Sequence, residues 1–119
     1  MGLFSSKQKA AFPWVKLTSS EQLHDLLKSS DTKPVLLFKH STRCSISSMA
    51  LNRFENNMDP EKATCVYLDL LAYRPISAEI EALTKVEHQS PQAILVNHNE
   101  VIYSATHNGI DASEILKLI

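Results

Sequence analysis

Short apolar runs alternate along the chain with stretches in which apolar residues recur every three or four positions. The runs at 35–38 and 64–71 are largely apolar without strict alternation, as in strands that are covered on both faces. Apolar residues at helical spacing occur within 23–27, 46–58 and 76–83. The pattern therefore predicts buried strands separated by helices, which is the arrangement of parallel β-α-β units.

The two ends of the chain complete this pattern. A short strand is expected at 14–17, and strands at 93–96 and 101–105 flank a polar turn, which predicts a hairpin. Asp111 and Glu114 have the capping-box spacing for a closing helix. The predicted order is β-α-β-α-β-α-β-β-α, an α/β fold in which helices cover both faces of a mixed sheet.

Length and composition restrict the class of protein. The 119 residues suffice for one domain, so we expect a flexible N-terminal segment over 1–12 and a single domain over 13–119. The net charge is -1 with scattered basic residues, which argues against nucleic-acid binding. No segment resembles a secretory signal or a membrane span, and two cysteines do not form a disulfide framework. We expect a cytoplasmic monomer without membrane attachment.

One cysteine stands between a polar turn and the second predicted helix. Free amides and the helix dipole at this position favour the thiolate of Cys44. Arg43, with Lys39 and His40 nearby, is expected to add positive charge on the same side. Ser47, one helical turn further on, could point its hydroxyl back at the sulfur. The layout is that of a Cys-x-x-Cys redox site with serine in place of the second cysteine. A packing cysteine is the alternative, although the polar neighbours of Cys44 argue against it.

The other candidate ligands and nucleophiles have simpler interpretations. Cys65 lies inside a predicted strand, where burial suppresses the thiolate, so we expect a packing residue and not a resolving thiol. His40 and Cys44 have an H-x-x-x-C spacing, but two ligands do not make a zinc site, and further ligands at a recognisable spacing are missing. His88 and His107 border the cysteine end of the predicted sheet, and the sequence assigns a role to neither.

Three segments together resemble one branch of the thioredoxin-fold proteins, the bacterial monothiol bacilliredoxin-like family of the bacillithiol system. The segments are Phe38–Ser47, Tyr73–Ser77 and His88–Gln92, and the resemblance covers most of the chain beyond Trp14. It implies a thioredoxin-like three-layer α/β/α sandwich. The chain departs from many family members at Ser45, where they carry a proline directly after the cysteine.

The resemblance also implies roles for particular residues. Cys44 matches the active cysteine, Ser47 the second position of the Cys-x-x-Ser motif, and Pro91 a cis-proline that faces the cysteine. Ser90 would offer backbone groups to an extended, peptide-like substrate. Substrate contacts are further expected from the turn before the cysteine, at His40, Thr42 and Arg43.

The implied activity is that of a monothiol thiol–disulfide oxidoreductase. Cys44 would remove a bacillithiol-like, low-molecular-weight thiol from mixed disulfides on client proteins, and a second small thiol would regenerate it. No metal or organic cofactor is expected, since the small thiol is a co-substrate.

Two other functions are compatible with the same residues. A non-catalytic binding module could use the cationic turn around Arg43 to hold an anion or a protein partner. An iron–sulfur carrier like the monothiol glutaredoxins could use Cys44, but their Cys-Gly-Phe-Ser motif is absent from this sequence.

Overall fold

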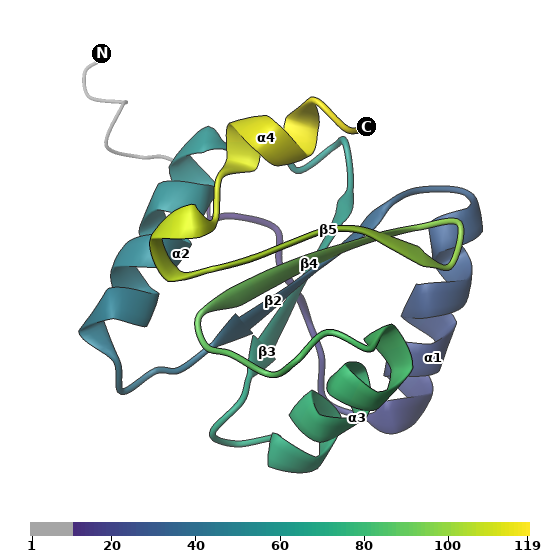
Figure 1. Cartoon of the computed structure of the whole chain (residues 1–119), viewed down its shortest axis with the longest axis horizontal. Coiled ribbons are helices and arrows are strands. Elements are labelled where there is room, and N and C mark those ends of the chain that lie inside the picture. Colours follow the sequence, from purple (N-terminus) through teal and green to yellow (C-terminus); the bar gives the residue numbers. More distant parts are fainter. Residues whose placement is uncertain (1–10) are drawn as a thin grey trace.

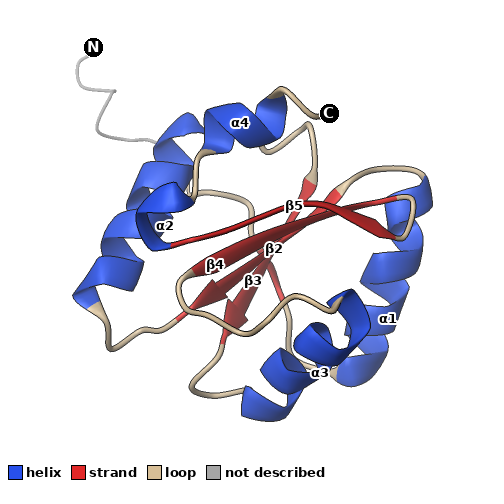
Figure 2. Cartoon of the chain, viewed as in Figure 1, coloured by secondary structure: helices blue, strands red, loops and turns tan. Residues whose placement is uncertain are grey.

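A five-stranded mixed sheet forms the centre of the molecule, and helices cover both of its faces (Figure 1; strands are red in Figure 2). The computed structural model describes residues 11–119. The elements, in chain order, are β1 (Val15–Lys16), α1 (Ser20–Lys28), η2 (Ser29–Asp31), β2 (Val35–His40), α2 (Ser45–Asn57), β3 (Thr64–Asp69), α3 (Arg74–Thr84), β4 (Gln92–Asn97), β5 (Glu100–Thr106), η3 (His107–Gly109) and α4 (Ala112–Leu116). Apart from the short 3₁₀ turns η2 and η3, this is the predicted order, and the thioredoxin-like α/β/α sandwich is confirmed.

The strands lie in the order β1-β3-β2-β4-β5. Strands β1, β3 and β2 are parallel, whereas β4 runs antiparallel to β2 and pairs with β5 as the expected hairpin. Because β2 and β3 are parallel, the segments that follow them emerge at the same edge of the sheet. This edge carries the turn that leads to Cys44.

Alternation along β2 divides the core between the two faces of the sheet. Leu36 and Phe38 pack in the cluster under α2 and α4, and Leu37 packs in the cluster under α1 and α3. Figure 1 shows these helix pairs on opposite sides of the sheet. All six residues of β2 are buried, as expected for the central strand of an α/β sandwich.

Caps define the ends of several helices. The side chain of Ser19 accepts a hydrogen bond from the Gln22 amide (3.1 Å), and the Gln22 side chain accepts one from the Thr18 amide (2.8 Å). Pro75 occupies the first turn of α3, where it removes no helical hydrogen bond. Asp111 caps α4 by accepting from the Ser113 amide at 2.9 Å. These caps are those that the sequence favours.

An aromatic cluster fills the α2 face of the sheet. The ring of Phe54 lies 5.6 Å from Trp14, 5.5 Å from Phe38 and 6.0 Å from Phe12 (centroid distances). Trp14 also donates its indole N–H to the carboxylate of Glu55 on α2. Packing therefore begins at Phe12, within the segment expected to be flexible, and residues 1–10 of that segment lie outside the described residues.

Phe54→Ala should lower the free energy of unfolding by about 3–5 kcal/mol, because it removes a 1% exposed ring from the centre of this cluster. Leu83→Ala serves as the control, since Leu83 on α3 is 43% exposed and should cost no more than about 1 kcal/mol. The measurement is urea unfolding followed by fluorescence. Equal effects of the two substitutions would contradict the assignment of Phe54 to the core.

Candidate active site

Cys44 is the N-cap residue of α2, at the end of the turn that follows β2. Its amide donates to the Ser41 carbonyl (3.2 Å), and its carbonyl accepts from the Ser48 amide (3.1 Å). The thiol is free and partly exposed. The chemistry available is nucleophilic attack on an incoming disulfide.

Ser47 is fully buried, and its hydroxyl is hydrogen-bonded to the end of the central strand. Its oxygen accepts from the Ser41 amide at 3.1 Å and lies 2.8 Å from Nδ1 of His40. The expectation that this hydroxyl points back at the sulfur of Cys44 is therefore not what the hydrogen bonds show. The physical reason is the partly buried Ser41 amide and the buried His40 ring, which both need polar partners. Ser47 links α2 to β2 and shapes the turn that carries the cysteine.

His40 lies beneath the turn and is 5% exposed. Burial lowers the pKa of its ring, and the nearby Asp69 carboxylate only partly opposes this effect. The ring also packs 5.6 Å from that of Tyr67 (centroid distance). A neutral, buried His40 positions the turn through Ser47, and its direct contact with a substrate stays a prediction.

Thr42 and Arg43 have exposed side chains in the turn directly before Cys44. Lys39 does not join them, contrary to expectation, because it is fully buried and faces α3 on the other side of the sheet. The alternation of β2 explains the difference, since position 39 shares a face with Val35 and Leu37. The exposed positive charge next to the cysteine on the turn thus comes from Arg43.

The peptide bond between Ser90 and Pro91 is cis, as predicted. Lys39 on β2 pairs with Gln92 on β4, so the antiparallel register places Pro91 beside the end of β2 that leads to Cys44. The Pro91 carbonyl accepts from the His107 amide (3.0 Å). The Ser90 hydroxyl oxygen is buried and has no hydrogen-bond partner among residues 11–119.

The two histidines without a predicted role both support the segment around Pro91. His107 has a positive φ of 53°, and its carbonyl accepts from the guanidinium of Arg53 at 3.2 Å. This contact ties η3, and through it the Pro91 carbonyl, to α2. His88 lies on the other side of the sheet, in the loop before Ser90, where it contacts Lys39.

Sequence reasoning missed a cluster on the α3 face in which the buried Lys39 and Ser77 meet the exposed His88. The Lys39 ammonium donates to the Ser77 carbonyl and to Nδ1 of His88, both at 3.1 Å. The Ser77 hydroxyl lies 3.2 Å from the same ring nitrogen. Burial lowers the pKa of Lys39 to about 8, although Glu81 acts in the opposite direction. The signal that could have revealed this cluster is the position of a lysine within an otherwise apolar central strand.

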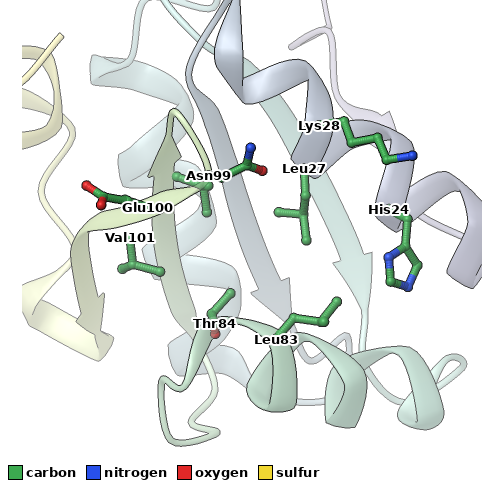
Figure 3. Close-up of a pocket in the computed structure, with 9 residues that line it drawn as sticks. His24, Leu27, Lys28, Leu83, Thr84, Asn99, Glu100 and Val101 are labelled. Atoms are coloured by element: carbon green, nitrogen blue, oxygen red, sulfur yellow. The ribbon is translucent and has the colours of Figure 1, made fainter.

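A cavity of about 550 Å³ is remote from Cys44. Figure 3 shows that its lining comes from α1, the end of α3 and the β4–β5 hairpin. The hairpin turn lies at the edge of the sheet where β2 begins, because β4 and β2 are antiparallel. This cavity therefore lies at the opposite end of β2 from Cys44.

Within 11–119, no three His, Cys, Asp or Glu side chains form a group that could hold a metal ion. Over the same residues, no helix has the length and apolar character needed to cross a membrane.

The sheet order, the thiol at the start of α2 and the cis-proline beside it define a thiol redox protein of the thioredoxin fold. The sequence model of the family described as "Monothiol bacilliredoxin BrxC" matches residues 15–115. The chain therefore belongs to the monothiol bacilliredoxin family, as its motifs indicated.

Solved structures show the same fold. A protein described as a candidate oxidoreductase with a thioredoxin fold is 29% identical, with a TM-score of 0.77 over 87% of this chain and 90% of that one. Thioredoxin from Malassezia sympodialis is 17% identical, with a TM-score of 0.69 over 92% and 90% of the two chains. Mitochondrial thioredoxin 3 from Saccharomyces cerevisiae is 19% identical, with a TM-score of 0.68 over 89% and 92%. The latter two similarities concern the fold alone.

A thiol reagent should label Cys44 rapidly in the native protein and Cys65 only after denaturation. Cys65 is 3% exposed, and burial raises its thiol pKa to about 12, so its thiolate is scarce at neutral pH. Intact mass and peptide mapping after a short pulse of iodoacetamide would measure both sites. Equal labelling of the two thiols, or a disulfide between them in oxidised protein, would revive a resolving role for Cys65.

Lys39 should make the stability of the protein depend on pH above neutrality. Its pKa is 10.5 in an unfolded chain and about 8 in the folded one, so the unfolded chain binds the extra proton between these values. Its contribution to the free energy of unfolding therefore rises as pH rises from about 8 to about 10.5.

The difference in stability between wild type and Lys39→Met should increase over this pH range, as measured by urea unfolding at several pH values. Lys62→Met, at an exposed position, is the matched control and should follow the wild-type profile. Parallel profiles for wild type and Lys39→Met would show that the lysine is not held as a buried cation.

Proposed function

We propose that this chain removes a low-molecular-weight thiol of the bacillithiol type from mixed disulfides on client proteins, with Cys44 as the nucleophile. One arrangement supports the proposal above all: a partly exposed thiol at the N-cap of α2 with a buried serine, Ser47, in the place of a second cysteine. The family membership supports a thiol-modified protein as the client class.

The reaction consists of two thiol–disulfide exchanges. The Cys44 thiolate attacks the small-thiol sulfur of the mixed disulfide, the S–S bond breaks, and the client cysteine leaves as a thiolate that takes up a proton. The small thiol is then joined to Cys44. A second small-thiol thiolate attacks the sulfur of the bound small thiol, which releases a symmetrical disulfide and regenerates the Cys44 thiolate. Cys44 is in the same oxidation state before and after the cycle, so the protein supplies no electrons to the net reaction.

A monothiol cycle follows from the positions of the other candidate groups. Ser47 offers a hydroxyl that is already hydrogen-bonded to His40 and Ser41. Cys65 pairs with Leu36 near the start of β2, whereas Cys44 follows the end of that strand. Within residues 11–119 an internal disulfide with Cys44 would require this second cysteine to leave the core.

Client binding is supported by two features around the thiol. Ile46 and Met49 on α2 are 53% and 66% exposed, and they provide apolar surface next to Cys44. Ser90 lies beside Pro91, where its backbone groups would pair with an extended substrate. In this function the protein acts as a monomer in the reducing cytoplasm, with the small thiol as its co-substrate and no metal or organic cofactor.

Wild-type protein and Cys65→Ser should release the small thiol from a client that carries a bacillithiol mixed disulfide, whereas Cys44→Ser should not. Without free small thiol, one equivalent of it should accumulate on Cys44, as detected by intact mass. Symmetrical disulfides of bacillithiol, glutathione and coenzyme A, offered separately, would identify the preferred thiol. Release by Cys44→Ser at the wild-type rate would overturn the proposal and favour a binding module. An adduct of the whole client on Cys44 would also overturn it, because it would show attack at the client sulfur and not at the small-thiol sulfur.

A further inference from the structure

A small cavity lies on the α3 face of the sheet, at the edge that carries the reactive thiol. Its volume is about 240 Å³, and it is lined by Leu70, Arg74, Ser77, Ala78, Glu81 and His88. These residues come from the segment after β3, from α3 and from the loop that precedes β4. In Figure 1, α3 and this loop adjoin each other below the sheet.

Two connections relate the cavity to Cys44. Leu70, in its wall, donates its amide to the carbonyl of His40 (3.1 Å), and His40 contacts Ser47 on α2. His88, on the other side of the cavity, precedes the cis bond at Ser90 by two residues. The cavity and the cysteine thus lie at the same edge of the sheet, on either side of the end of β2.

The lining presents hydrogen-bond donors. The Lys39 ammonium has no lone pair, so Nδ1 of His88 must accept at their 3.1 Å contact, and a neutral ring carries its proton on Nε2. Burial and the charge of Lys39 lower the pKa of His88, which keeps the ring neutral. His88 is exposed at the cavity, so its Nε2–H is available to a ligand.

The lining holds one cation, Arg74, and one anion, Glu81, and the buried ammonium of Lys39 lies behind His88. Among residues 11–119 the ion pairs are those of His24, His98 and Lys117, so neither Arg74 nor Lys39 has a carboxylate partner within 4.0 Å. Glu81 is the acidic residue of the lining, and its carboxylate accepts from the His88 amide (3.1 Å). With a neutral His88, the lining and the Lys39 ammonium behind it together carry two positive charges and one negative charge. A ligand with one negative charge would therefore bring the total charge to zero.

We propose that this cavity binds a carboxylate of the small thiol that exchanges at Cys44. The Arg74 guanidinium matches a carboxylate through two parallel N–H donors, and the Nε2–H of His88 supplies another. The Lys39 ammonium, which contacts Nδ1 of the His88 ring, adds a further positive charge. The volume suits a carboxylate and a few carbon atoms and not a whole cofactor, so the rest of the thiol would extend past Ser90 to Cys44. This assignment rests on the proposed exchange at Cys44.

The first test compares disulfides of ω-mercaptocarboxylic acids of increasing chain length with the disulfides of the corresponding primary amides. The rate of adduct formation on Cys44 is measured by intact mass at fixed pH and ionic strength. At one preferred length the acid should react about tenfold faster than the amide, as expected for a charge-assisted hydrogen-bonded pair. Arg74→Gln should bring this ratio close to one, and Glu81→Gln should increase it.

Lys85→Gln is the matched control, because it removes one positive charge from the other end of α3, outside the cavity. It should leave the ratio unchanged. A ratio that is independent of chain length, or that falls equally in Lys85→Gln and Arg74→Gln, would indicate general attraction of anions and would overturn the proposed site.

A second measurement is independent of exchange. In Cys44→Ser, the S-methyl thioether of the preferred acid should shift the ring resonances of His88 in NMR titrations, whereas the matching amide should not. Equal shifts with acid and amide, or no shift with either, would contradict the carboxylate site. If no disulfide reacts at Cys44 but the acid still shifts His88, the proposed exchange fails and the cavity assignment stands as an anion site.

Discussion

The burial of β2 on both faces is the constraint on which the arrangement of the site depends. From Val35 to His40 every residue of this strand is buried, including the two polar residues at its end. Polar groups taken out of water need hydrogen-bond partners, so the structure must supply them on both sides of the sheet. Ser47 on α2 does so for His40, and Ser77 with His88 does so for Lys39.

These two sets of hydrogen bonds attach the turn before Cys44 and the loop before Pro91 to the central strand. The contact of Ser47 with the His40 ring and the Ser41 amide fixes where α2 begins, and therefore where Cys44 stands. The contact of Lys39 with His88 attaches the loop that runs into the cis-proline. The thiol and the cis-proline are thus held by adjacent residues of one strand, which keeps their mutual position constant.

Much of this arrangement follows from local sequence signals. The order of elements comes from apolar periodicity, and the placement of Cys44 at a helix start comes from the polar turn between a buried run and a helical pattern. The burial of Cys65 follows equally from its apolar neighbours. The cis bond before Pro91 was expected from family resemblance, because an isolated X-Pro dipeptide favours trans.

Other features depend on tertiary contacts that periodicity does not encode. The direction of Lys39 follows from strict alternation along β2, but its burial depends on partners 38 and 49 residues away, Ser77 and His88. The packing of Phe12 depends likewise on Phe54, in a distant helix. A polar residue in a central strand shows that a partner must exist, whereas only the fold shows which residue provides it.

By the same reasoning, Ser47 has a structural role as well as taking the place of a second thiol. Its oxygen accepts a backbone N–H and contacts a ring nitrogen of the buried His40. A cysteine sulfur is a weak acceptor and its S–H a weak donor, so a thiol at this position would leave the Ser41 amide and His40 poorly satisfied. Each buried polar group left without a partner costs about 1–3 kcal/mol. The serine therefore stabilises the turn that presents Cys44, and in this chain the monothiol character of the motif and the geometry of its turn depend on the same hydroxyl.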